Sequence, residues 1–281
     1  MSRKQVSKYI FQDTIAIEEK NKKVMSMLDL HTCAENLPVI IERAKKEKLS
    51  YDHFLEQLWE VELHAREDAR LLRWKKQARF TWQKNLEEYD FTRPKEINKG
   101  RILELADCTW VKKGENFIFF GPTGVGKTHL SIALGLKAIE EGYKTRFIRV
   151  QELAEMIETA LDRDIQRGRN ENKNKLLNFF TQIPLLILDD LSYSNLQPRC
   201  SEFLFHLFFG RYDAKRSTIL TGNEGFESWI TSLFSGDKEK TSAVIDRLME
   251  TGETIMITGD SYRITTLRKQ RGKEKGKEII K

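Results

Sequence analysis

Residues 121–128 have the types and spacing of a phosphate-binding loop. They read Gly-Pro-Thr-Gly-Val-Gly-Lys-Thr and fit the pattern G-x-x-x-x-G-K-[ST]. Glycines in such a loop let the backbone turn its N–H groups inward and form a concave anion site. The Lys127 ammonium can reach the outer phosphates of a nucleotide, and the Thr128 hydroxyl suits a magnesium ion held between them. The residues predicted to bind nucleotide are Gly121, Pro122, Thr123, Gly124, Val125, Gly126, Lys127, Thr128 and the following His129.

Two carboxylates directly follow an apolar run. Residues 185–188 are Leu-Leu-Ile-Leu, and Asp189 and Asp190 come next. A buried strand that delivers a carboxylate to its end is how P-loop enzymes hold magnesium, so Asp189 is predicted to be a metal ligand together with Thr128. Asp190 is then placed to orient and deprotonate the attacking water. Alone, the pattern also fits a strand that ends in a polar turn, but its place downstream of a phosphate-binding loop favours the metal site.

Three more polar residues are candidates for the same site. Asn223 follows another apolar run, and it could touch the attacking water or the γ-phosphate if that strand lies between the two nucleotide strands. It fits a turn asparagine equally well. Arg247 and Arg263 have the character of surface ion-pair residues, although an arginine aimed at a γ-phosphate can accelerate transfer by about 10³–10⁵-fold.

The elements that must position these residues alternate from about residue 100 onward. Apolar runs typical of strands occur at 116–120, 145–150, 185–188, 218–221 and 254–257. Helical patterns lie between them, which predicts an α/β fold with a parallel five-stranded sheet flanked by helices. Ligands in such folds bind beyond the carboxyl ends of the strands. The phosphate-binding loop lies between the first of these runs and a helical pattern, as its chemistry requires.

The first hundred residues are predicted to be mainly helical, and they contain little that suggests strands. Residues 25–48 fit one helix near their start and a second that begins after Pro38, and Ser50 can cap the next helix. That third helix changes from acidic and apolar to basic and aromatic, and residues 66–84 hold seven basic residues against Glu67 and Asp68. The predicted DNA contacts are Arg66, Arg70, Arg73, Lys75, Lys76 and Arg79. A solvated helix face with aromatics packed on a core is the alternative.

Charge and composition divide the chain further. Residues 1–100 carry a net +3, residues 101–263 a net −2 and residues 264–281 a net +5, which sum to the +6 of the whole chain. A near-neutral core with basic ends suits a polyanionic partner, nucleic acid first. With a linker around Pro94, we expect a helical domain over 1–90, a nucleotide-binding domain over 91–268 and a basic, disordered tail over 269–281.

The compartment is predicted to be the cytoplasm. Three cysteines, Cys33, Cys108 and Cys200, are far apart and lack C-x-x-C spacing, which favours reduced, buried thiols and argues against a zinc site. No apolar run is long enough for a membrane span and the first residues lack a signal-peptide core, so no membrane partner is expected.

Taken together, the pattern resembles the IstB-like transposition helper ATPases, AAA+ proteins related to the DnaC-type helicase loaders. The segments that carry the resemblance are 28–34, 60–80, 89–91, 121–128, 146–147, 185–191, 211–212, 217–223, Trp229, 246–248 and 261–263. This resemblance implies an AAA+ fold behind a small all-helical domain. Two departures are Ser192, where the family has Gly, and Gly222, where it has Ser; we expect them to tune geometry without loss of activity.

The resemblance also implies roles that spacing could not assign. Asn223 looks like the polar sensor, Arg247 like an arginine finger that acts on a neighbouring subunit's nucleotide, and Arg263 like the second sensor. A finger in trans implies a homo-oligomer with ATP at subunit interfaces. The family's known behaviour implies Mg²⁺-dependent hydrolysis of ATP to ADP as a timer. It also implies assembly on double-stranded DNA, deformation of that DNA and recruitment of a cognate transposase.

Other functions fit parts of the sequence. A DnaC-like helicase loader would share the whole ATPase core, and only the helical region favours the transposition helper. A small-molecule kinase could use the same loop but would not need basic ends. An ATP-bound scaffold without hydrolysis would keep every binding residue, and replacing Asp190 would separate it from an ATPase.

Overall fold

The computed structural model describes residues 17–82, 84–191, 196–223, 225–226, 229, 234 and 236–262. It separates into two compact units, Met1–Arg73 and Trp74–Lys281, and the division falls inside one helix. The sequence analysis predicts the boundary between the helical and nucleotide-binding domains later in the chain, after residue 90. The physical reason for the earlier division is that residues beyond 74 pack on the second unit. Phe80, for example, lies 6.3 Å from the Phe147 ring between ring centres.

The first unit is helical, as predicted. Its first helix covers residues 17–27, and α2 (His31–Glu47) follows. The third helix, α3 (Tyr51–Ala78), begins in this unit and ends in the second one. A small core of Cys33, Leu37, Ile40 and Leu58 joins α2 to α3. The Ser50 hydroxyl accepts a hydrogen bond from the His53 N–H at 3.3 Å, which bears out the predicted cap.

The predicted start of the second helix after Pro38 is wrong. α2 begins at His31, and Pro38 lies inside it. Proline removes one backbone donor within a helix and normally disfavours that position. Here the flanking Leu37 and Ile40 are 2% and 7% exposed, so burial of the helix face outweighs the lost hydrogen bond.

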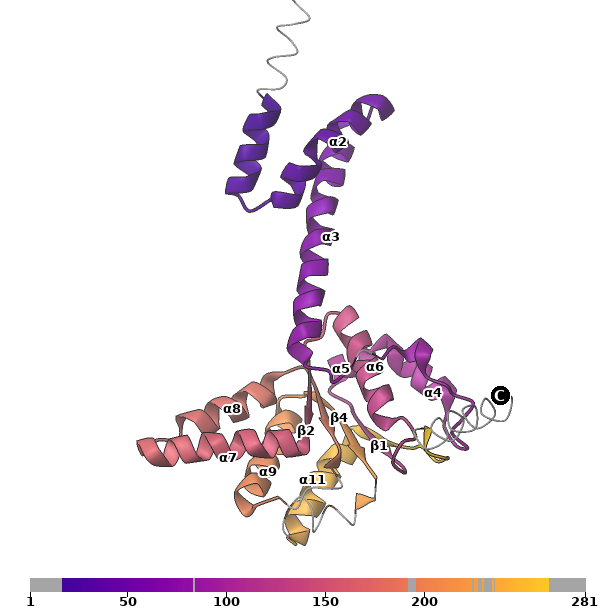
Figure 1. Cartoon of the computed structure of the whole chain (residues 1–281), viewed down its shortest axis with the longest axis vertical. Coiled ribbons are helices and arrows are strands. Elements are labelled where there is room, and N and C mark those ends of the chain that lie inside the picture. The colour runs from indigo at the N-terminus through magenta and orange to yellow at the C-terminus, as the bar shows by residue number, and fades with distance from the viewer. Residues whose placement is uncertain are drawn as a thin grey trace, which may run out of the picture. The chain divides into compact units, whose positions relative to one another are not determined.

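The second unit is built on a five-stranded sheet (Figure 1). Its strands are β1 (Asn116–Phe120), β2 (Thr145–Arg149), β3 (Leu185–Asp189), β4 (Ser217–Gly222) and β5 (Gly252–Met256). Every neighbouring pair is parallel, and the order is β2-β3-β4-β1-β5. The parallel sheet predicted from alternation is therefore confirmed. β4 lies between β3 and β1, so the strands that lead to Asp189, Asn223 and the phosphate-binding loop are adjacent.

Helices and short turns connect these strands and cover both faces of the sheet (Figure 1). The larger helices are α6 (Lys127–Glu140), α7 (Val150–Arg167), α8 (Glu171–Gln182), α9 (Pro198–Asp213) and α11 (Lys238–Glu250). The shorter ones are η1 (Leu86–Glu88), α4 (Lys99–Glu104), η2 (Leu105–Asp107) and α5 (Thr109–Lys113). Among the described residues, no helix is both long and apolar enough to cross a bilayer.

Alternate side chains of the strands feed two separate cores. Phe117 and Phe119 of β1 join a cluster with α6, whereas Ile118 and Phe120 join one with α7, α8 and α9. This alternation follows from the two-residue period of a strand, and it explains why the strand segments are apolar without interruption. The three cysteines are buried free thiols, as the sequence predicts. Burial is the main cause that raises the pKa of Cys108 to about 12.

Candidate functional site

The phosphate-binding loop lies at the carboxyl end of β1 and leads directly into α6. Gly121, Gly124 and Gly126 have φ angles of +150°, +87° and +101°. A Cβ on Gly121 would lie 1.9 Å from the Ile257 carbonyl oxygen, and one on Gly124 would lie 2.2 Å from the Ser261 hydroxyl. Only glycine fits this turn, which brings the loop backbone and the N-terminus of α6 to one place.

Lys127 is the first residue of α6, and its side chain folds back over the loop. The ammonium nitrogen donates to the carbonyl oxygens of Gly121 at 2.7 Å and Pro122 at 2.9 Å. It also donates to the side-chain oxygen of Asn223 at 2.7 Å. The residue is 7% exposed, so this positive charge is held inside the site. Charged phosphate oxygens are stronger acceptors than carbonyls, so the same ammonium can turn to a bound nucleotide.

Asp189 ends β3 and receives two hydroxyl hydrogen bonds. The Thr128 hydroxyl donates to Asp189 Oδ1 at 2.8 Å, and the Thr221 hydroxyl donates to the same oxygen at 2.6 Å. A hydroxyl and a carboxylate at this separation are hard oxygen donors, which fit a magnesium ion. The structure thus brings together the two residues that the sequence predicted as metal ligands.

Asp190 leaves the strand in a left-handed conformation, with φ of +66°. Its backbone N–H donates to the Thr221 hydroxyl at 2.9 Å, so Thr221 joins the two acids. Asp189 is 4% exposed, whereas Asp190 is exposed. Asp190 also lines a hollow of about 650 Å³ together with Arg149 and Glu158. One acid is therefore buried among oxygen donors, and the other meets solvent where water can reach it.

Thr221 is a site residue that the sequence reasoning missed as a separate contributor. It is 1% exposed and bonds Asp189 across the boundary between β4 and β3. Its signal in the sequence is a hydroxyl residue directly after the apolar pair 219–220, two positions before Asn223. A contact between two strands depends on their register, which spacing along the chain does not give.

Tyr89 is a second residue with an unpredicted place beside the loop. Its hydroxyl donates to the Val125 carbonyl at 2.9 Å, and a Cβ on Gly126 would lie 2.5 Å from its ring. The ring also packs edge-on against His129 with 5.3 Å between ring centres. Burial, with a smaller contribution from the Asp90 charge, raises the pKa of Tyr89 to about 12, so the phenol keeps the proton that it donates.

His129 points from α6 to the segment before Tyr89. Its Nε2 lies 2.9 Å from the Asn85 carbonyl oxygen, so it acts as the donor in the matching tautomer. Burial is the main cause that lowers the pKa of this imidazole. The predicted nucleotide-binding residue thus holds a linker carbonyl in this structure.

Arg247 lies on α11 and stacks on an aromatic residue of α9. Its guanidinium carbon is 3.8 Å from the Phe209 ring centre, and it donates to the Ala243 carbonyl at 3.0 Å. The guanidinium is also 5.7 Å from the ring centre of Tyr212. Its role as a finger stays a prediction, because only one subunit is present. Arg263, Ser192 and the basic tail lie outside the described residues.

The predicted DNA contacts lie on α3 and just after it, in both units. Arg66 donates to Glu62 at 2.8 Å and to the Asp29 carbonyl at 2.7 Å, and Arg70 donates to Glu67 at 2.5 Å. In the second unit, Lys75 is 3.1 Å from Glu140. The other predicted contacts, Arg73, Lys76 and Arg79, are exposed. No contact with DNA is tested by this structure.

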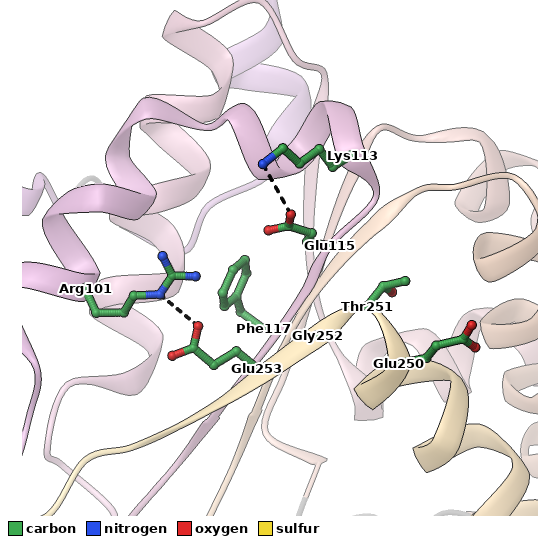
Figure 2. Close-up of a pocket in the computed structure, with 8 residues that line it drawn as sticks. All are labelled: Arg101, Lys113, Glu115, Phe117, Glu250, Thr251, Gly252 and Glu253. Atoms are coloured by element: carbon green, nitrogen blue, oxygen red, sulfur yellow. Dashed lines mark hydrogen bonds and ion pairs between the residues drawn. The ribbon is translucent and has the colours of Figure 1, made fainter.

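Another hollow, of about 420 Å³, lies at the amino ends of β1 and β5 (Figure 2). Figure 2 shows two ion pairs among its charged side chains: Arg101 with Glu253 at 2.8 Å and Lys113 with Glu115 at 3.6 Å. Ligands of parallel α/β folds bind at the opposite, carboxyl edge. The carboxyl edge, with the loop and the two acids, is therefore the candidate site.

The comparisons with known proteins find relatives that are described as ATP-binding. A sequence model of the family described as IstB-like ATP binding protein matches residues 23–270. The insertion sequence IS5376 ATP-binding protein of Geobacillus stearothermophilus is 32% identical over 92% of this chain and 99% of its own length. The insertion sequence IS21 ATP-binding protein of Pseudomonas aeruginosa is 35% identical over 88% of this chain and 89% of its own.

Among solved structures, DnaI is similar in fold. It is 20% identical, with a TM-score of 0.52, and the match covers 63% of this chain and 92% of that one. At this identity the likeness concerns the fold alone.

Proposed function

The chain belongs to the family of IstB-like ATP binding proteins, and on that premise we propose that it is an AAA+ ATPase of DNA transposition. It assembles on target duplex DNA, deforms it and recruits the partner transposase. ATP hydrolysis serves as the timer of that assembly. The observation that carries the ATPase part is the convergence of Lys127, Thr128, Asp189 and Asn223 at one edge of the sheet.

The nucleotide is proposed to bind in the loop of residues 121–128, with its phosphates at the start of α6. The loop backbone and the Lys127 ammonium supply positive potential for the phosphates. Thr128 and Asp189 would hold Mg²⁺, which neutralises charge on the β- and γ-phosphates when bound. The existing 2.8 Å contact between these two side chains supports that assignment.

Asp190 is proposed to orient the attacking water and accept its proton. Its exposure and its place on the hollow beside β3 support this role. Asn223 responds to the γ-phosphate, because its side-chain oxygen already contacts the Lys127 ammonium. A γ-phosphate that draws the ammonium away would release Asn223, and this exchange links the state of the nucleotide to the end of β4.

Arg247 is proposed to act on the nucleotide of a neighbouring subunit, and Arg263 on that of its own. The stacking of Arg247 on Phe209 supports the first role, since it holds the guanidinium at a defined place on α11. An arginine that completes a site in trans makes hydrolysis depend on assembly. The active species is accordingly a homo-oligomer.

DNA binding is proposed from the charge of the two ends of the chain and from the transposition context. The relatives' names place them in insertion sequences. The basic residues at and after the end of α3 would contact phosphates, with little reading of bases. Affinity should then depend strongly on salt and weakly on sequence. A helicase-loading role has no observation of its own in its favour, because the DnaI likeness concerns the fold only.

The experiment that tests the ATPase assignment is phosphate release by the full chain and by Asp190→Asn, with DNA and Mg²⁺ present. The variant keeps the size and the polarity of the side chain but cannot accept a proton. We expect nucleotide binding to persist and phosphate release to fall by at least about 10²-fold. Unchanged phosphate release would remove Asp190 from the mechanism, and a chain that binds ATP without any hydrolysis would be a scaffold.

A further inference from the structure

α3 carries a row of exposed and half-buried side chains to one side of the buried Leu58. Successive residues of a helix advance by about 100°, so positions spaced three and four apart share a face. This row, called the α3 stripe, consists of Asp52, Leu55, Trp59, Leu63, Arg66, Arg70 and Arg73. Leu63 is 65% exposed, and Leu55 and Trp59 are each 44% exposed. The α2 contacts use a different side of the helix, centred on the buried Leu58.

The two halves of the α3 stripe have opposite character. The first half is apolar with an acid at its end, and the second half is basic. The stripe is also nearly symmetric about a point between Glu62 and Leu63. Asp52 and Arg73 lie equally far from that point, and so do Leu55 and Arg70. Trp59 and Arg66 form the innermost such pair.

We propose that the α3 stripe is a self-association surface, on which the α3 stripe of a second copy of this chain lies antiparallel. A two-fold axis through the midpoint then makes each pair of residues occur twice. Asp52 faces Arg73 of the second copy, and Trp59 faces Arg66, where a guanidinium over an indole ring is attractive. The two Leu63 side chains meet beside the axis.

Two other occupants fit the stripe less well. DNA would cover the arginines and leave Leu55, Trp59 and Leu63 in water. A basic helix of another protein would cover the apolar half and repel the arginines. A second copy covers both halves at once, and it gives each Asp52 an Arg73 of opposite charge and each Trp59 ring an Arg66 guanidinium.

Arg66 and Arg70 already have partners within the first unit. Arg66 is bonded to Glu62 and Arg70 to Glu67 on the same helix, and Arg66 also donates to the Asp29 carbonyl just before α2. The Arg70–Glu67 pair is exposed on both sides and contributes little to stability, so it can exchange on association. Glu62 is buried, so Arg66 keeps its bond to Glu62 and can present only the free face of its guanidinium. Arg66, Arg70 and Arg73 then serve the pair of helices, and Lys75, Lys76 and Arg79 lie beyond it.

The first test is sedimentation of the full chain over a range of concentrations without nucleotide. Without ATP, association through the α3 stripe is measured separately from assembly through the ATP site, so the failure of one proposal can be told from the failure of the other. Lys127→Ala should leave the sedimentation without nucleotide unchanged. We expect a reversible dimer whose dissociation constant rises about fivefold or more in Asp52→Arg or in Arg73→Asp. The double variant should recover to within about twofold, because the swapped pair attracts again.

The matched control is Glu60→Arg, which reverses the same charge on the same helix but off the stripe. It should leave the dissociation constant unchanged. A chain that stays monomeric at every concentration would overturn the proposal. A double variant whose dissociation constant stays as high as those of the single variants would also overturn it. If Arg73→Asp lowers DNA affinity without changing sedimentation, the stripe belongs to the DNA surface instead.

Cross-linking gives a second readout that needs no change in affinity. Cys33, Cys108 and Cys200 are at most 1% exposed, so a new surface thiol is selectively reactive. With a short bis-maleimide, Leu63→Cys should form a covalent dimer, and the adjacent His64→Cys, which lies off the stripe, should not. Equal cross-linking of both variants, or of neither, would contradict the antiparallel geometry.

Discussion

The ammonium nitrogen of Lys127 lies 2.7 Å from the side-chain oxygen of Asn223, which joins the start of α6 to the end of β4. The two residues lie far apart in the sequence, and the strand order brings them together because β4 runs between β1 and β3. A nucleotide that draws Lys127 to its phosphates must change this contact. A change in the bound nucleotide would therefore be passed to β4 through the contact between Lys127 and Asn223.

Asn223→Ala should separate nucleotide binding from hydrolysis. Lys127 and the loop remain, so the affinity for ADP should stay within about threefold, whereas phosphate release should fall by about 10²-fold as one polar contact to the transition state is lost. Fluorescent-nucleotide binding and phosphate release measure the two quantities. An equal loss of both would mean that Asn223 only holds Lys127 in place.

Thr221→Val should disturb both acids at once. Valine has nearly the same shape, but it can neither donate to Asp189 nor accept from the N–H of Asp190. We expect hydrolysis to fall about tenfold or more and the Mg²⁺ concentration needed for half-maximal rate to rise, whereas Thr221→Ser keeps the hydroxyl and should retain most of the activity. The matched control is Thr218→Ser, on the same strand but bonded to Arg211. A fully active Thr221→Val would show that the hydroxyl is dispensable.

Arg247 should act on a neighbouring subunit. Lys127→Ala and Arg247→Ala chains should each be nearly inactive, because each lacks one half of every site. Mixed in equal amounts, roughly a quarter of the interfaces pair an intact loop with an intact arginine, and activity should return to about that fraction of the unaltered chain. Phosphate release by the mixture is the measurement. Inactivity of a mixture that still assembles would place Arg247 in its own subunit's site or outside catalysis.

His129 predicts a pH dependence of stability. Its pKa in the folded chain is lowered below the ordinary 6.5, mainly by burial, so the unfolded chain binds a proton more readily. Stability should therefore be lost as pH falls through and below that ordinary value. Thermal unfolding at about pH 7.5 and about pH 5.5 should show a smaller pH effect in His129→Gln than in the unaltered chain. His64→Gln, on exposed α3, is the control, and an unchanged pH effect in His129→Gln would exclude this residue as its source.

Much of the ATPase unit follows from the sequence, because uninterrupted apolar runs mark buried parallel strands. The expected run at 185–188 appears as β3, whose last residue is Asp189, and the P-loop glycines have the backbone angles that the motif demands. The place of Asn223 near the loop needed only the assumption that β4 lies between the nucleotide strands, and the strand order bears this out.

Other features depend on information that the local sequence does not carry. The contact of Thr221 with Asp189 depends on the register between β4 and β3, and Tyr89 reaches Val125 from a linker with no motif for that contact. The start of α2 was misplaced because proline is a strong local signal, and burial of neighbouring residues overrides it. The division within α3 reflects packing of Phe80 and its neighbours rather than a change in composition.

Binding of a fluorescent DNA duplex by the full chain tests the central claim most directly. It should be measured with ADP, with ATP and with a slowly hydrolysed ATP analogue, each over a series of salt concentrations. The account predicts tight binding with the analogue, weaker binding with ADP, and affinity that falls linearly with the logarithm of salt concentration as phosphate contacts are lost. Binding that is independent of both nucleotide and salt would contradict it.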